Sequence, residues 1–191
     1  APELGISLAD NHKSYQNYPM MKDITVKVNA KGDAKDIAFR RANDLITTYY
    51  VCCSDPFPNM FAFSPSAESV YAAWYSYAAG YNGMLRWAYN SWPEDPVVDS
   101  RFRKFPSGDT YFVYPDGRSS IRFERLKEGI QDVEKIKILK LGFLKKNSNE
   151  SIFKLAELNN TVEKFNVIGK PDTPVEQMLK EAKRVINELS E

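Results

Sequence analysis

Apolar and polar positions alternate or cluster in four short stretches of the chain, which predict four β-strands. Alternation predicts strands around residues 4–9 and 23–28, and apolar runs predict two more at 45–53 and 80–92. The last stretch is bulky on both faces, as is typical of a buried strand in a parallel sheet that helices cover. Helices or helix-length connections separate the strands, so the order of elements predicts an α/β domain.

Capping residues indicate where the helices between these strands begin. Asp33 suits the N-cap of a helix that runs to Ala42. Ser64 followed by Pro65 is a strong start signal for a second helix, and Gly80 ends it. The predicted order is therefore β, β, α, β, α, β.

The connection after the last strand is long. Residues 93–117 carry several charged side chains, which we expect to hold the loop in place by ion pairs. Loops of this length in compact domains usually have a function. Ser119 or Ser120 then caps a long helix, in which apolar residues recur at helical spacing.

The C-terminal part has a different composition from the rest. From Asn147 onward the chain consists of short polar pieces, with helices expected around 151–165 and after a capping box at 173–176. We expect these helices to pack on the outside of the domain. The chain accordingly divides into residues 1–146 and a helical extension, residues 147–191.

Four parallel strands are compatible with a small open sheet or with half of a (β/α)₈ barrel, which needs about 250 residues when complete. A length of 191 residues favours the half barrel. In both architectures ligands bind at the carboxyl ends of the strands. Asn90 and Trp92 follow the last strand, and an amide beside a flat aromatic face suits a sugar ring. Alternatively, Trp87 and Trp92 are packing residues of the core.

Composition narrows the range of partners. With 43% hydrophobic and 27% charged residues, the chain is typical of one globular domain. Its 26 basic and 25 acidic side chains leave a net charge of +1, which favours neither nucleic acid nor an acidic lipid surface as partner. No apolar run approaches the roughly twenty residues that a membrane-spanning helix requires. The chain begins with alanine rather than methionine, so we expect a processed product, a recombinant product or a piece of a longer protein.

The cysteines and the histidine predict no metal site and no cofactor. Cys52 and Cys53 are neighbours, whose Cα atoms lie about 3.8 Å apart across a trans peptide, short of the usual disulfide range. We expect both to be small buried apolar residues. Together with His12, the only histidine, they are too few for a zinc site.

Eight groups of residues form a series with a characteristic order and spacing: 50–53, 58–59, 83–92, 99–103, 108–109, 114–115, 120–124 and 129–132. This series resembles the family called domain of unknown function 4091. That family is similar to the catalytic barrel of family 123 glycoside hydrolases, the β-N-acetylgalactosaminidases. The resemblance covers about the middle two-thirds of the chain.

The resemblance implies the C-terminal half of a (β/α)₈ barrel, strands five to eight. In the family, an Asp-Glu dipeptide at the end of barrel strand four supplies the acid/base glutamate and its neighbouring aspartate, and the acetamido group of the substrate is the nucleophile. This chain contains no Asp-Glu dipeptide. We therefore expect it to supply a sugar-binding pocket and to be catalytically inert by itself.

The residues expected to bind hydroxyl groups or stack on the sugar lie at the strand ends. Arg86, on the same strand face as Ala88, is expected to line the barrel interior, while Trp87 and Tyr89 face the helices. For Tyr50 the alternative is filling of the barrel, and for the residues after the first strand it is a simple turn. The candidate set is Asp10, Asn11, Tyr50, Arg86, Asn90 and Trp92.

Two functions remain open at this point. The first is the C-terminal portion of a glycosidase-like protein that acts on N-acetylhexosamine-containing glycans when its N-terminal half is present. The second is a non-catalytic carbohydrate-binding or structural module. A half barrel leaves strand edges and one face open, so its expected partner is the missing N-terminal half or a second copy. The resemblance further implies a bacterial exported protein, in the periplasm or at the cell surface.

Overall fold

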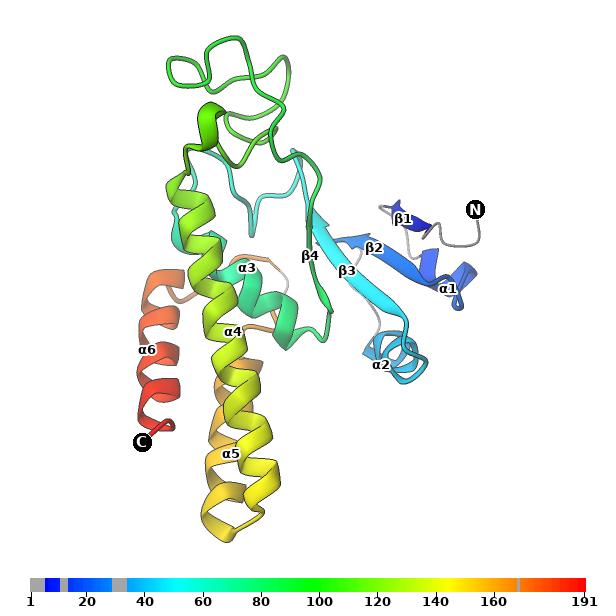
Figure 1. Cartoon of the computed structure of the whole chain (residues 1–191), viewed down its shortest axis with the longest axis vertical. Helices are drawn as coiled ribbons and strands as arrows, with labels where there is room; N and C mark the ends of the chain where they lie inside the picture. The colour runs from blue at the N-terminus through cyan, green and yellow to red at the C-terminus, as the bar shows by residue number, and fades with distance from the viewer. Residues whose placement is uncertain (1–5, 11–13, 29–33, 168) are drawn as a thin grey trace.

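The computed structural model describes residues 6–10, 14–28, 34–167 and 169–191 of the chain (Figure 1). The side chains of Asp10, Ser14 and Tyr15 are not described. The strands are β1 (Ser7–Asp10), β2 (Asp23–Lys27), β3 (Ile46–Val51) and β4 (Gly83–Arg86). The helices are α1 (Ser14–Asn17), α2 (Ala34–Ala42), α3 (Ala67–Ala78), α4 (Ile121–Lys146), α5 (Asn149–Glu163) and α6 (Val175–Glu188), with a 3₁₀ turn at Pro115–Gly117.

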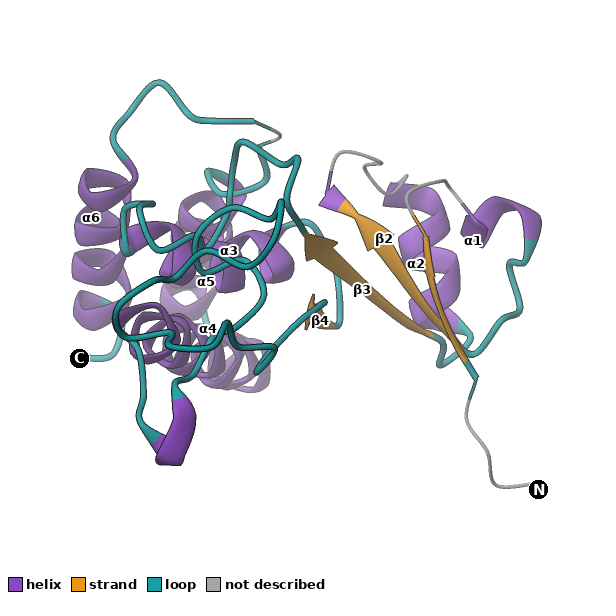
Figure 2. Ribbon diagram, turned by 90° about the horizontal axis from the view of Figure 1, so that it is seen from above, coloured by secondary structure: helices purple, strands orange, loops and turns teal. Residues whose placement is uncertain are grey.

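The four strands form one parallel sheet in the order β1-β2-β3-β4 (Figure 2). This arrangement confirms the predicted α/β class. Each strand lies beside the previous one because a helix or a long connection returns the chain to the starting edge. Within the described residues, β1 and β4 are the edges of the sheet.

The register gives the sheet two different faces. Val26, Tyr49 and Met84 are neighbours in the register, and Tyr49 is fully buried with its hydroxyl donating to the carbonyl of Ala72 in α3 at 2.7 Å. This side is the helix face. The opposite side, here called the second face, carries Asp23, Thr25, Lys27, Ile46, Thr48, Tyr50, Gly83 and Leu85.

The second face is partly polar and partly exposed. The hydroxyls of Thr25 and Thr48 lie 2.7 Å apart and share a hydrogen bond across the two central strands. Leu85, on the edge strand, is 41% exposed. No helix of the described residues packs on Leu85 in the way that α3 covers Tyr49.

Helix α3 lies at the centre of the core. Its residues from Ala67 to Ser76 are all buried, between the sheet on one side and α4, α5 and α6 on the other. The indole of Trp74 donates to the Asp132 carboxylate of α4 at 3.0 Å, and Phe165 packs on the Trp74 ring with 4.6 Å between ring centroids. The C-terminal helices therefore share one core with the sheet.

A buried arginine, which the sequence did not reveal, holds the amino ends of two strands. The Arg40 guanidinium donates to the Thr47 hydroxyl at 2.7 Å and to the carbonyls of Pro19, Met21 and Ile46 at 2.7 to 2.9 Å. Burial lowers the pKa of Arg40, and nearby Asp23 acts in the opposite direction. The guanidinium thus ties α2 to β3 and to the segment that enters β2.

Two predictions about capping were wrong. Helix α3 begins at Ala67, after Ser66, because the Ser64 hydroxyl bonds instead to the side-chain oxygen of Asn59. Pro174 is the N-cap of α6 and makes no side-chain cap bond, so the expected capping box does not form. By contrast, Ser120 caps α4 and accepts a hydrogen bond from the Phe123 amide, as predicted. Asp33 lies outside the described residues.

Two predictions about strand length and burial were also wrong. Strand β4 ends at Arg86, well before Trp92, because residues 89–91 pair with the returning segment 110–112 and leave the parallel sheet. Cys52 is half-buried and Cys53 is exposed, because both lie in the turn after β3 rather than in the strand.

Two glycines of α4 should respond in opposite ways to alanine. A Cβ at Gly129 would lie 2.7 Å from the Val70 carbonyl oxygen and 3.0 Å from the Ala73 Cβ, so Gly129→Ala should destabilise the protein by about 1–3 kcal/mol. A Cβ at Gly142 meets nothing within 4 Å, so Gly142→Ala should stabilise it by about 0.5–1 kcal/mol through helix propensity. Urea unfolding measures both changes. Two substitutions of the same sign would show that α3 and α4 are not in this close contact.

Candidate functional site

The carboxyl ends of β2 and β3 meet in a charged cluster. The Lys27 ammonium lies 2.6 Å from the Ser54 hydroxyl and 3.6 Å from the Asp55 carboxylate. Asp55 is buried and also accepts a hydrogen bond from the Cys52 amide at 2.7 Å. Burial by itself lowers the pKa of Lys27, but Asp55, together with nearby Cys52 and Tyr50, raises that pKa above its ordinary value. Lys27 is thus a fixed cation at the rim of the second face.

The loop after β3 is fastened to the start of α3. The Asn59 side-chain NH₂ donates to the Pro56 carbonyl at 2.9 Å, and the Asn59 backbone N–H donates to the Glu68 carboxylate at 2.9 Å. Burial raises the pKa of Glu68, although the Asn59 amide and the more distant Lys170 favour its charged form. The loop is therefore fastened by the buried Glu68 carboxylate, which accepts a hydrogen bond from one backbone N–H.

A second buried cluster lies where β4 ends. The Asp109 carboxylate accepts from the Trp87 indole at 3.1 Å and lies 3.3 Å from the Arg86 guanidinium. Arg86 and Arg122 lie over the Phe112 ring, with guanidinium carbons 5.6 Å and 5.5 Å from its centroid. Burial lowers the pKa of Arg86, and the ion pair with Asp109 opposes this change.

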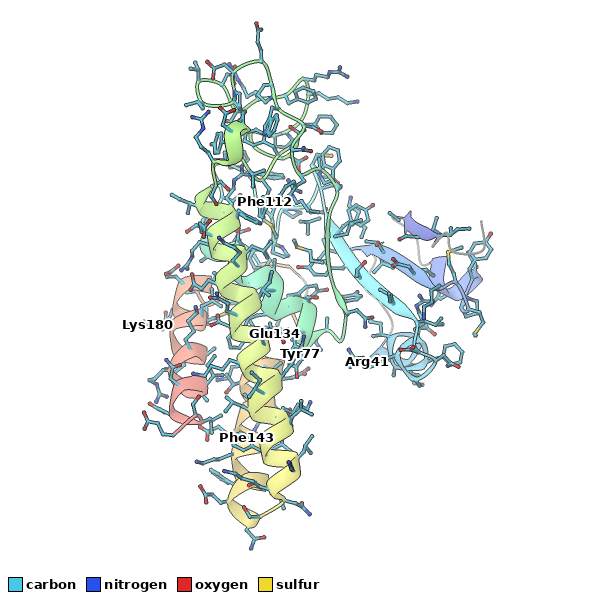
Figure 3. All side chains as sticks on the ribbon, viewed as in Figure 1. Arg41, Tyr77, Phe112, Glu134, Phe143 and Lys180 are labelled. Carbon is cyan, nitrogen blue, oxygen red and sulfur yellow. The ribbon has the colours of Figure 1, made fainter. Side chains whose placement is uncertain are left out.

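The segment after β4 is held by the returning end of the long loop. Phe112 donates its amide to the Tyr89 carbonyl at 2.7 Å, and Asn90 and Tyr111 form an antiparallel bridge. The Trp92 indole donates to the Val113 carbonyl at 2.7 Å. Figure 3 shows Phe112 near the beginning of α4, where this loop ends. Asn90 and Trp92 are thus positioned by one returning segment.

The predicted site residues occupy different parts of this edge. Tyr50 is half-buried on the second face, in register with Leu85 and beside Lys27. Asn90 is exposed and Trp92 is half-buried. Asp10 ends β1 in register with Val26, and Asn11 lies outside the described residues.

The side predicted for Arg86 was wrong. Its register partner is Val51, which lies on the helix face with Tyr49, and its guanidinium packs on Phe112 rather than lining the second face. Trp87 lies in the bend after the strand, and its indole donates to the same Asp109 oxygen that Arg86 contacts. Local sequence does not specify register, and the two faces of β4 were therefore exchanged in the prediction.

Sequence reasoning missed two residues that shape the edge, Lys27 and Asp55. Lys27 lies on β2 and Asp55 lies in the turn after β3, and this relation leaves no local pattern. Asp109 was expected to hold the long loop by an ion pair, and it pairs with Arg86.

Comparison with known proteins decides the family. The sequence model of the glycoside hydrolase 123 catalytic domain matches residues 1–139, which include the whole sheet and most of α4. This chain belongs to glycoside hydrolase family 123. No curated protein matches it.

Among solved structures, a family 123 glycoside hydrolase from Clostridium perfringens, described in a study of glycolipid glycan hydrolysis, has the same fold with a TM-score of 0.77 and 23% sequence identity. The alignment covers 98% of this chain but 35% of that enzyme. The structural similarity therefore extends beyond the family match over α5 and α6, while this family 123 chain spans about a third of the enzyme's length.

Two absences hold for the residues that the structure describes. These residues contain no group of three or more His, Cys, Asp or Glu side chains that could hold a metal ion. None of the helices described is long and apolar enough to cross a membrane.

Glu68→Gln should change how stability depends on pH. Because the folded protein raises the pKa of Glu68, protonation at this site favours the folded state, a gain that is lost as pH rises through the folded pKa. The free energy of unfolding of the parent, relative to Glu68→Gln, should therefore increase from pH 7 toward pH 4, as measured by urea unfolding. Glu181→Gln is the control of opposite sign, because the bond to Arg184 lowers the Glu181 pKa. A parent and Glu68→Gln with parallel pH profiles would contradict the expectation.

Proposed function

We propose that the chain is the C-terminal portion of a family 123 catalytic barrel, strands five to eight, and that its carboxyl edge holds N-acetylhexosamine-containing glycans. The observation that carries this proposal is the sheet of four parallel strands in chain order, with one face covered by helices and the other face partly exposed. In a (β/α)₈ barrel the second face would point to the interior, and the carboxyl edge would form the active-site rim. The polar and aromatic residues gathered at this edge support the proposal.

The residues that this chain brings to the carboxyl edge suit binding rather than catalysis. Hydrolysis assisted by a substrate acetamide needs one carboxyl held protonated beside the scissile oxygen and a second that orients the amide. Two buried aspartates lie at the carboxyl edge, but Asp55 is paired with Lys27 and Asp109 with Arg86. Each is paired with a basic side chain, and the sequence lacks the Asp-Glu dipeptide of the family. The catalytic carboxyls would come from the N-terminal half.

The finer placement of the chain rests on resemblance. The motifs at residues 83–92 and 99–103 support membership of the branch called domain of unknown function 4091. For the same reason we assign the parent protein to the periplasm or surface of a bacterium. A role as a non-catalytic carbohydrate-binding module remains the second candidate. It is favoured because both buried aspartates already form ion pairs within the chain.

The open edge of β4 is the contact surface for the other half of the barrel. Beside this edge lies a groove of about 540 Å³ between β4, α3 and α4, lined by Tyr81, Met84, Leu126, Ile130 and Val133. Arg41, Tyr77 and Glu134 also line it, and Figure 3 shows them between α4 and the sheet. A parallel strand added to β4 would bury these apolar side chains and the open strand edge together. The N-terminal half of a family 123 barrel supplies such a strand.

The activity test compares the chain with a reassembled barrel. The 191-residue chain should give no hydrolysis of p-nitrophenyl N-acetyl-β-D-galactosaminide but should bind N-acetylhexosamine glycans in calorimetry. Adding a separately produced N-terminal half of a family 123 barrel should restore turnover. Hydrolysis by the chain alone would contradict the division of roles, and a chain that binds no glycan would contradict the pocket.

The groove predicts which surface residue controls association. Ile130 lines the groove and is 48% exposed, so Ile130→Asp should weaken association with the N-terminal half about tenfold or more in analytical ultracentrifugation. Phe153→Asp is the control, because Phe153 is 72% exposed on α5 and does not line the groove. Equal weakening by both substitutions, or association of the chain with itself alone, would assign the groove to a different occupant.

A further inference from the structure

One tryptophan at the carboxyl edge combines exposure with a fixed orientation. Trp87 is the residue after β4 and is 37% exposed, whereas Trp74 is buried in the core. It lies two positions after Leu85, which is exposed on the second face. A large aromatic ring that stays partly exposed beside a candidate pocket is suited to contact a ligand.

The Trp87 ring is held in place by Asp109 and Phe105. Its indole N–H donates to the Asp109 carboxylate at 3.1 Å, and Asp109 is fully buried and bound to Arg86. The Phe105 ring lies beside it, with 5.1 Å between centroids and 41° between ring planes. Because the polar end of the indole is engaged, the accessible part of Trp87 is apolar ring.

A fixed aromatic ring recognises the apolar C–H face of a sugar ring. Stacking of this kind requires little ordering on binding when the aromatic side chain already has one orientation. Tyr50 and Lys27, which are neighbours in the register, lie at the same carboxyl edge of the sheet. Trp92 is less suited to stacking, because it is half-buried against the returning segment.

We propose that Trp87, flanked by Phe105, is the stacking platform for a hexopyranose ring at the carboxyl edge, and that Asp109 is the residue that positions it. This inference rests on the proposed glycan-binding function and deepens it by assigning the contact to one side chain.

The test titrates the 191-residue chain with methyl N-acetyl-β-D-galactosaminide, followed by calorimetry and by tryptophan fluorescence. Trp87→Ala should weaken binding about tenfold or more, because the stacking surface is lost. Trp87→Phe keeps an aromatic face and should retain most of the affinity, but it should lose the fluorescence change on binding. The surface control Phe153→Ala should keep both signals, and Trp92→Phe shows whether that second ring carries the fluorescence change instead.

Each outcome bears on a separate claim. If the parent chain binds and Trp87→Ala binds equally well, or if Trp92→Phe rather than Trp87→Phe loses the fluorescence change, the platform assignment is overturned while glycan binding stands. If the parent chain binds no sugar, the proposed function and this inference both fall.

Circular dichroism and thermal unfolding check that each variant folds. If Trp87→Ala does not fold, Trp87→Phe and Phe105→Ala decide, and the latter should lower affinity severalfold.

Asp109→Asn tests the positioning role. Asparagine can still accept the indole N–H but removes the charge beside Arg86, so the fluorescence change should persist with affinity within about threefold of the parent. Asp109→Ala removes the acceptor and should reduce both affinity and the fluorescence change. Thermal unfolding separates this effect from a loss of stability, since a purely structural role would lower the melting temperature while leaving the affinity of the folded fraction unchanged.

Discussion

The burial of α3 between the sheet and the C-terminal helices is the constraint on which the rest of the structure depends. The helix face of the sheet needs an apolar cover, and α3 supplies it, with the Tyr75 ring 5.0 Å from the Tyr49 ring of β3. The other side of α3 needs a cover of its own, which α4, α5 and α6 provide. Gly129 allows α4 to approach the α3 backbone closely. The position of α4 in turn fixes Arg122 beneath the loop that carries Asp109.

Much of this fold was predictable from sequence because local patterns of residues specify its strands and helices. Apolar runs and turn residues gave four strands in the right order, and Ser120 gave the start of α4. The failures have a common physical origin, since they involve side chains with a choice of partner. Ser64 had the signature of a cap but bonds to Asn59 five residues earlier, and the end of β4 is set by pairing with a segment some twenty residues later.

The location of the candidate site was more predictable from sequence than the residues that form it. Polar and aromatic residues at the strand ends do lie at the carboxyl edge, as Tyr50 and Asn90 illustrate. Which side of β4 each residue occupies depends on register, which is a property of neighbouring strands and not of the stretch itself. Arg86 therefore lies on the side opposite to the one expected. Lys27 lies on β2 and Asp55 lies in the loop after β3. Such a pair becomes visible only once the sheet is assembled.

The contact of Tyr71 with Phe165 joins positions 94 residues apart, and it lies in the same core as the sheet. A ribosome delivers the chain from its amino end, so the strands emerge long before the segment that seals α3. Until then the apolar helix face of the sheet has no lasting cover, and the nascent chain must remain soluble by other means. Contacts of such long sequence separation also slow folding, because the intervening chain has to be ordered first. The core that the described residues form is thus closed only after α5 and α6 have been made.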